Sequence, residues 1–313
     1  MAQIKEDSFF ITKIKKAEKL LGLETEIKWK ATFYAVAFHT CAVVWIYYYA
    51  LPVKWQSVLL AYVMFLISGV GITAGAHRYW THRAFKATTP MRLIFLFAFA
   101  SGAQLALREW VWLHRVHHKY SDTDSDPHNS RRGLFFSHIG WLLMEQKKEV
   151  TSKSNEIDMR DIDNDLLVTW YCKNVRIVNP LVGYILPTAI SILLLGENWQ
   201  VAIAWQCFIK FLFFYHVQLS VNSFGHSIGN RPYNKHVRPV DNFILSLLTW
   251  GDGSHNYHHA FPFDYKSSER THKLHLTTAL INLGERLGWV SDKREATQEF
   301  VKKYVSKHSI VGG

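Results

Sequence analysis

The chain has 313 residues, of which 49% are hydrophobic and 15% aromatic, and it carries a formal net charge of +11. A basic balance of this size suits nucleic acid, anionic lipid or an anionic substrate. The sequence holds no nucleic-acid-binding motif, and its basic residues lie beside apolar segments, so we expect lipid and substrate as partners and no nucleic acid. Cys41, Cys172 and Cys207 have no paired spacing, which argues against a disulfide framework or a thiolate metal site.

Four apolar segments approach the roughly 20 residues that are needed to cross a bilayer. The preceding residues 1–30 are polar and basic and lack the apolar core of a signal peptide, so they are predicted to form a cytosolic N-terminal segment. The predicted transmembrane helices are 31–53, 55–76, 175–195 and 199–221. Only a short turn at Pro52 separates the first two, which predicts a helical hairpin.

Eight of the seventeen histidines stand close together in the sequence. They form three clusters: His77 and His82; His114, His117 and His118; His255, His258 and His259. Imidazole is the commonest metal ligand, and helix positions three or four apart share a face, so each His-x-x-His-His run aims at least two ring nitrogens at one point. The five-residue spacing of the first cluster does not fit one regular helical face, which predicts a local bend or a shared site. At least eight histidines and a repeated cluster predict two metal ions.

The membrane topology decides whether the clusters can share one site, because all ligands must lie on the same side of the bilayer. Two predicted spans separate the second and third clusters, but only the apolar stretch 93–107 separates the first two. This stretch has about 15 residues and contains Gln104, so we expect it to lie along the interface or pack on the protein. Lys and Arg concentrate in the two terminal regions and in 77–176, which the positive-inside rule assigns, with every histidine cluster, to the cytosol.

The sequence therefore predicts an all-α integral membrane protein with four transmembrane helices and a cytosolic helical cap that holds a histidine-rich di-metal site. A further histidine, His226, follows the last span, one helical turn after Asn222. Its position where a span emerges on the ligand side predicts a ninth metal ligand. Asn222 is predicted to hold a metal-bound water or to support a ligand by a hydrogen bond.

The clusters stand within longer motifs. These are Gly-Ile-Thr-Ala-Gly-Ala-His-Arg at 71–78, the run 114–124, Asp-Pro-His-Asn at 126–129, Phe-Ser-His-Ile-Gly-Trp at 136–141, Asn-Ser with His226 at 222–226, and the run 255–265. Over about residues 30–290 the chain resembles the membrane-bound fatty acyl desaturases, specifically the acyl-CoA Δ9 (stearoyl-CoA) type. The resemblance implies a desaturase domain at 31–290 and a cytosolic C-terminal tail at 291–313.

The same resemblance implies a di-iron centre with O2 as co-substrate, nine histidine ligands and a water positioned by Asn222. It also implies reduction by cytochrome b5 and its reductase, and a multi-pass location in the endoplasmic reticulum membrane with both termini cytosolic. Removing hydrogen from an unactivated methylene requires a redox-active metal with oxygen, which agrees with iron and not with zinc alone.

Several residues are candidates for contact with a long-chain acyl-CoA. Phe65, Gly69 and Thr73 lie twelve, eight and four residues before His77 on one helical face. They are predicted to line the acyl tunnel, with Gly69 leaving room and Phe65 forming the floor; packing against other helices is the alternative. The other candidates are Trp110, beside the acyl chain or simply buried, and Lys119, Arg131 and Arg132, near the anionic headgroup or simply solvated.

The chain departs from the family pattern in three places. Trp112-Leu113 stands where animal acyl-CoA desaturases usually carry Arg-Asp, Gly-Asp-Gly-Ser at 251–254 replaces the commoner Gly-Glu-Gly-Phe, and Tyr-Trp-Thr at 79–81 replaces Leu-Trp-Ser. We expect these changes to touch the surroundings of the headgroup and acyl chain and not the ligands, which leaves substrate form and regiospecificity open.

The leading hypothesis is an acyl-CoA desaturase that makes a cis double bond, at Δ9. A desaturase of other regiospecificity and a di-iron fatty acyl hydroxylase or acetylenase are the enzymatic alternatives, because the same oxidant can also insert a hydroxyl group. A membrane receptor or metal carrier is the alternative without catalysis.

Overall fold

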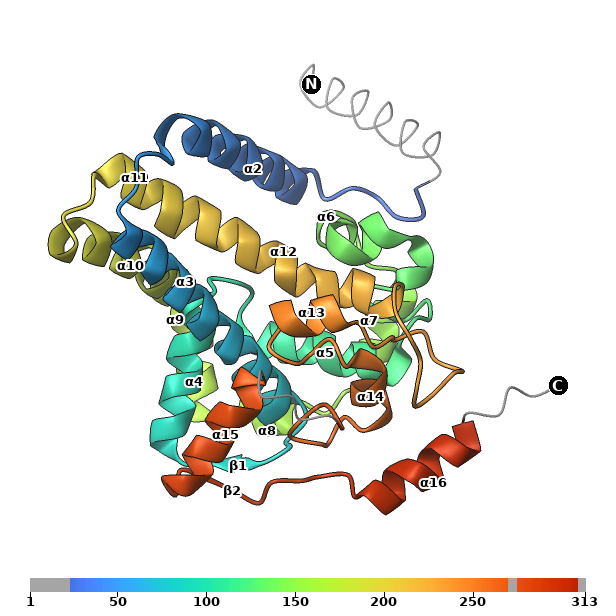
Figure 1. Cartoon of the computed structure of the whole chain (residues 1–313). Helices are drawn as coiled ribbons and strands as arrows, with labels where there is room; N and C mark the ends of the chain where they lie inside the picture. The colour runs from blue at the N-terminus through green and yellow to red at the C-terminus, as the bar shows by residue number, and fades with distance from the viewer. Residues whose placement is uncertain (1–22, 270–274, 309–313) are drawn as a thin grey trace.

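The computed structural model describes residues 23–269 and 275–308, and this part of the protein is mostly helical (Figure 1). Two short strands, β1 (Lys86–Ala87) and β2 (Val290–Ser291), pair antiparallel with Lys86 opposite Ser291. The predicted helical class is confirmed. Of the predicted terminal segments, residues 1–22 and 309–313 lie outside the described residues.

Four helices in the described residues are long and apolar enough to cross a bilayer, which confirms the predicted number. The first is α2 (Trp29–Tyr49). The second, Trp55–Thr81, joins α3 (Trp55–Val70) to the π-helix η1 (Gly71–Thr81). The third, Leu166–Leu194, consists of α9 (Leu166–Pro180), η4 (Leu181–Ile185), α10 (Leu186–Ala189) and η5 (Ile190–Leu194). The fourth, Trp199–His226, consists of α11 (Trp199–Ile203), η6 (Ala204–Ile209), α12 (Lys210–Ser223) and η7 (Phe224–His226).

The helix ends differ from the prediction. α2 ends at Tyr49 and not at 53, because the chain turns before Pro52, whose ring cannot continue a helix. The third helix begins at 166 and not at 175, since the Asp165 side chain accepts hydrogen bonds from the amides of Leu167 and Val168 and caps it there. The second and fourth helices run past their predicted ends to Thr81 and His226, beyond the apolar residues on which the prediction rests.

The apolar stretch after the first histidine cluster forms a helix that is too short to cross a bilayer. This helix is α4 (Thr89–Ser101), whose 13 residues span only about 20 Å at 1.5 Å per residue. A Cβ added at Gly71 would lie 2.1 Å from the backbone nitrogen of Phe99, so the glycine allows the backbones of η1 and α4 to approach closely. α4 therefore packs on the protein with one side, while Leu93, Ile94 and Phe97 remain exposed on the other, so placement along the interface stays a prediction.

The cap consists of shorter helices. They are α5 (Leu107–Tyr120), η2 (Ser130–Arg132), η3 (Phe136–Gly140), α6 (Trp141–Leu143), α7 (Lys148–Ser154), α8 (Arg160–Asp163), α13 (Phe243–Leu248), α14 (His255–Ala260), α15 (Leu276–Arg286) and α16 (Gln298–His308). Figure 1 shows α5, α13 and α14 gathered beside the C-terminal parts of α3 and α12. The described part of the predicted C-terminal tail is not loose, because Val301 and Tyr304 of α16 pack with Tyr257 and Phe261 in a small hydrophobic core.

Candidate metal centre

The structure brings all nine predicted histidines together in two groups. Within each group the candidate ligand atoms lie within 4.8 Å of one another. The five-histidine group consists of His77, His82, His114, His118 and His258. The four-histidine group consists of His117, His226, His255 and His259. Two clusters of histidine-only donors at this spacing suit two ions of iron, zinc or copper.

The two His-x-x-His-His runs divide between the groups in opposite ways. On α5, His114 and His118 are four residues apart and face the five-histidine group, while His117 between them faces the other. On α14, His255 and His259 face the four-histidine group, while His258 faces the five-histidine group. Helical periodicity explains the division, because residues four apart share a face and the intervening residue does not. α5 and α14 therefore each contribute to both groups.

The first cluster uses a different helix type. His77 lies in η1 and His82 directly follows it, and the His82 amide donates to the carbonyl of His77 at 3.1 Å, five residues back. A π-helix pairs residues five apart, so this spacing places both imidazoles on one face. The π-helix thus takes the place of the predicted bend, and both histidines belong to the same group.

Within each group the imidazoles converge through their Nε2 atoms. In the five-histidine group, His258 Nε2 lies 2.8 Å from His77 Nε2 and 2.9 Å from His118 Nε2. In the four-histidine group, His255 Nε2 lies 3.0 Å from His226 Nε2 and 3.2 Å from that of His259. This convergence of one nitrogen type is the arrangement expected of imidazoles around a common cation.

Three buried carboxylates fix the orientation of three of these rings from behind. Asp252 Oδ2 lies 3.1 Å from His77 Nδ1, and Asp122 Oδ2 lies 2.9 Å from His226 Nδ1. Asp126 accepts from His117 Nδ1 at 2.9 Å, and its oxygens also accept the backbone amides of Asp122 and His128. A carboxylate can only accept, so the proton of each ring lies on Nδ1 and the Nε2 lone pair points into the group.

The sequence prediction missed these carboxylates. Asp122 and Asp126 follow the second cluster within a few residues, so acidic residues beside ligand runs could have indicated them. Asp252 lies in the segment 251–254, where the sequence departs from the family pattern. This segment was predicted not to touch the ligands, but Asp252 contacts His77 directly. Arg78 Nη2 donates to the other Asp252 oxygen at 2.8 Å, so this aspartate joins two neighbouring residues of the first cluster. The prediction for this departure was therefore wrong.

Burial favours the neutral form of four imidazoles in the five-histidine group. Burial, and secondly the neighbouring rings, lower the pKa values of His82, His114, His118 and His258 well below the usual range. Burial alone would raise the pKa of Asp252, but His77 and Arg78 outweigh it and hold that pKa well below its ordinary value. Neutral imidazole and ionised carboxylate are the forms that bind and orient a metal.

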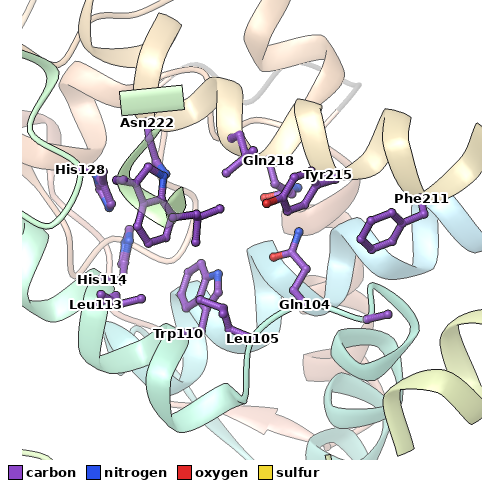
Figure 2. Close-up of a pocket in the computed structure, with 14 residues that line it drawn as sticks. Gln104, Leu105, Trp110, Leu113, His114, His128, Phe211, Tyr215, Gln218 and Asn222 are labelled. Atoms are coloured by element: carbon purple, nitrogen blue, oxygen red, sulfur yellow. The ribbon is translucent and has the colours of Figure 1, made fainter. Parts of the chain in front are cut away.

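A pocket of about 290 Å³ adjoins the metal centre (Figure 2). Figure 2 shows His114, His128 and Asn222 at one end of it and Phe211 at the other. Its walls are Ala103, Gln104, Leu105, Trp110, Leu113, His114, His128, Trp141, Leu142, Phe211, Tyr215, Gln218, Leu219 and Asn222. The structure thus places the predicted Trp110 and Asn222 in the wall, and the Trp110 ring stacks on that of His114 with centroids 4.9 Å apart.

Phe65, Gly69 and Thr73 do not line this pocket. A Cβ at Gly69 would lie 1.9 Å from the indole of Trp250, so that indole fills the room that the glycine was predicted to leave. The Phe65 ring also packs on Trp250, with centroids 5.0 Å apart, and the hydroxyl of Thr73 lies 2.7 Å from that of Thr277. This face of the second span packs against other elements, which is the alternative stated from the sequence.

The three predicted headgroup cations also lie outside the pocket wall. Lys119 pairs with Glu156 at 3.3 Å, and Arg132 pairs with Glu24 at 3.2 Å while its guanidinium covers a phenylalanine ring. Arg131 is exposed. At the departure 112–113, Leu113 lines the pocket. None of the three predicted cations therefore lies in the wall of the pocket. Leu113 does, which fits the prediction that this departure from the family pattern affects the surroundings of the acyl chain.

Comparison with known proteins agrees with this geometry. The family model described as fatty acid desaturase matches residues 53–281. The chain belongs to the fatty acid desaturase family. The predicted resemblance and the prediction of an enzyme of the desaturase class are therefore confirmed.

Named relatives of this desaturase chain cover most of its length. It is 36% identical to an acyl-CoA Delta-9 desaturase of Acheta domesticus, over 90% of this chain and 79% of the relative. It is 38% identical to stearoyl-CoA desaturase 5 of Bos taurus, over 90% and 84%. An acyl-CoA Delta(11) desaturase of Trichoplusia ni is also 38% identical, over 85% and 76%. Identity at this level therefore does not separate regiospecificities.

Proposed function

We propose that the protein inserts a cis double bond, at Δ9, into a long-chain fatty acyl-CoA in an oxygen-dependent reaction. The observation that carries this proposal is a largely apolar pocket whose wall includes His114 of the five-histidine group, together with the two convergent histidine groups themselves. The names of the relatives support acyl-CoA as the carrier. The Delta(11) relative makes a desaturase of other regiospecificity the second candidate.

The nine histidines are proposed to hold two iron ions, with Asn222 beside a metal-bound water. Iron with O2 would supply the oxidant that an unactivated methylene requires. The protein's own part is to hold the rings through Asp252, Asp126 and Asp122 and to present the chain along Trp110, Leu219 and their neighbours, away from bulk water.

The electrons are proposed to come from cytochrome b5 and its reductase. The basic balance of the regions that flank the spans supports a cytosolic placement of both termini and of the histidines, in the endoplasmic reticulum membrane. The ligands His77 and His226 both stand near the C-terminal ends of membrane-crossing helices, which supports a site at one side of the bilayer.

Expression in a desaturase-deficient yeast tests the proposal. We expect growth without added unsaturated fatty acid, and mass spectrometry of the lipids should locate a new cis double bond at carbon 9. A bond at another carbon refutes only the position, and a hydroxylated or acetylenic product indicates the alternative enzyme classes. His117→Ala and His258→Ala should abolish the product in a folded protein. Absence of any new product in the wild type would refute the enzymatic proposal and leave a receptor or metal carrier.

The form of the substrate is tested in parallel with purified enzyme and a reducing system. Stearoyl-CoA and a stearoyl phospholipid are supplied separately in nanodiscs, and each product is analysed directly. Conversion of stearoyl-CoA supports the proposed carrier. Conversion of the phospholipid alone would show that the departure at 112–113 reflects a different carrier.

A further inference from the structure

α13 presents an apolar face that no described element covers. Phe243 and Ile244 are each 69% exposed, Leu247 is 46% exposed and Leu248 38%. Phe224 and Ile228 extend the same kind of surface between the fourth span and α13. Exposed apolar surface of this extent marks a site of interaction with protein, ligand or membrane.

A groove of about 420 Å³ separates this helix from the fourth span. Its walls are His138, Phe213, His216, Val217, Ser220, Phe224, Asn242, Ile244, Leu245 and Leu248. None of these lining residues, all within the described chain, is charged. Positions 213, 217, 220 and 224 lie on one face of α12 and η7, so the groove follows the C-terminal part of the fourth span.

Both ring nitrogens of each histidine in the groove lie within hydrogen-bonding distance of another side chain. His138 Nδ1 lies 3.0 Å from Ser223 Oγ, and His138 Nε2 lies 3.0 Å from His216 Nδ1. His216 Nε2 in turn lies 3.2 Å from Nε2 of His39 on α2. Each nitrogen of the two lining imidazoles is therefore engaged within the protein.

The other polar side chains of the groove are also bonded. Ser220 Oγ donates to the carbonyl of Val217, and the Asn242 amide donates to that of Ile228 while its oxygen caps α13. The groove thus offers surface without free donors, which fits a hydrocarbon chain and not a polar ligand.

The depth of the groove matches the edge of the bilayer core. The fourth span has 28 residues and is about 42 Å long, whereas the hydrocarbon core is about 30 Å thick, or about 20 residues. Trp199 begins this span, and tryptophan favours the membrane–water interface. Measured from there, Phe213 lies at hydrocarbon depth and Phe224 at headgroup depth. The exposed face of α13 continues the lipid-facing surface of the span.

We propose that α13 lies in the membrane interface and that an acyl chain of a bilayer lipid occupies the groove between α13 and α12. The helix connects directly to the turn before α14, because the Gly251 amide donates to the Ser246 carbonyl at 2.9 Å and the Asn242 amide to the Gly253 carbonyl at 2.8 Å. Asp252, which holds His77, stands within that turn.

Depth-dependent fluorescence quenching tests this placement. The three native cysteines are first replaced by Cys41→Ser, Cys172→Ser and Cys207→Ser. Phe243→Cys or Ile244→Cys is then introduced into this cysteine-free protein, one in each variant, and the single thiol is labelled with bimane. The protein is then placed in phosphatidylcholine nanodiscs with nitroxide on the lipid acyl chains. A chain that retains only Cys41, exposed on α2, provides the lipid-facing control, and Lys302→Cys, exposed on α16, provides the aqueous control.

We expect quenching at both α13 positions that lies between the two controls, below that of Cys41 near the middle of α2 and about twofold or more above that of Lys302→Cys. Quenching equal to that of Lys302→Cys at both positions would overturn the proposal. The wild-type protein gives an independent readout that needs no substitution. Nanodiscs with diazirine-bearing phosphatidylcholine should yield cross-links to residues 243–248 after illumination, and their absence, with cross-links to α2 present, also overturns it.

Discussion

Replacing Asp252 by asparagine should weaken metal binding selectively at the five-histidine group. In the wild type one Asp252 oxygen contacts His77 and the other accepts from Arg78. The side chains of Asp252, His77 and Arg78 are 9%, 5% and 1% exposed, respectively. The substitution keeps the size of the side chain and removes its charge. His77 and Arg78 then share a single amide oxygen as acceptor, so one of them loses its hydrogen bond, and Arg78 also loses its buried counter-ion.

The magnitude follows from these contacts. Loss of a carboxylate behind a ligand typically lowers metal affinity 10–100-fold, or about 1.4–2.7 kcal/mol. Removing one partner of a buried ion pair costs about 3–5 kcal/mol of stability. The retained amide oxygen, and the Arg78 hydrogen bonds to Tyr265 and Thr278, reduce that cost. We therefore expect a loss of stability together with the loss of metal affinity, and metal content is compared on folded protein.

The assay is competition of the purified iron-loaded protein with a chelator, followed by metal analysis per chain. Asp252→Asn should release about one of two metals at a 10–100-fold lower chelator concentration than the wild type. Asp126→Asn should weaken the other metal, and the double variant should release both. Asp158→Asn, at an exposed carboxylate away from the ligands, is the control. Wild-type retention of both metals by Asp252→Asn would refute the orienting role of Asp252.

Three further substitutions test the packing and the pocket. Gly69→Ala directs a methyl group at the Trp250 indole and should lower stability by about 1–3 kcal/mol, seen as a lower unfolding midpoint; an unchanged midpoint would contradict that contact. His216→Leu removes the hydrogen-bond partner of both His39 and His138 and should lower the free energy of unfolding by about 1–3 kcal/mol, with metal content unchanged. Loss of metal would instead show that these three hydrogen-bonded histidines are coupled to the metal centre. Leu219→Trp narrows the pocket and should reduce product formation about 100-fold at unchanged metal content, whereas normal activity would show that the acyl chain lies elsewhere.

Hydropathy and spacing predicted the features that depend on nearby residues. Apolar length identified four spans, and the need for all ligands to lie on one side of the bilayer predicted that the stretch after His82 does not cross it. The three clusters were predicted to share one site, and the structure brings their histidines together. His226 was found because it follows a span, and its ring lies in the four-histidine group.

The remaining features depend on contacts between distant parts of the chain. Asp252 reaches His77 across 175 positions, and Trp250 fills the space beside Gly69, so neither contact leaves a local pattern. The π-helix at His77 and His82 differs from an α-helix by its hydrogen bonds, which residue type alone does not determine. The sequence around Gly69 is the same whether this glycine faces a substrate tunnel or packs against the Trp250 indole, so it could not distinguish the two.

The order of the histidines along the chain determines when each of the two groups can be completed during synthesis. Both groups require α14, since His258 completes one and His255 and His259 complete the other. α14 follows the fourth span, so all four membrane helices precede it during synthesis. A chain stopped before residue 255 would hold four ligands of one group and two of the other. Neither histidine group can therefore be complete before α14 has been synthesised, and truncated products cannot assemble either full group.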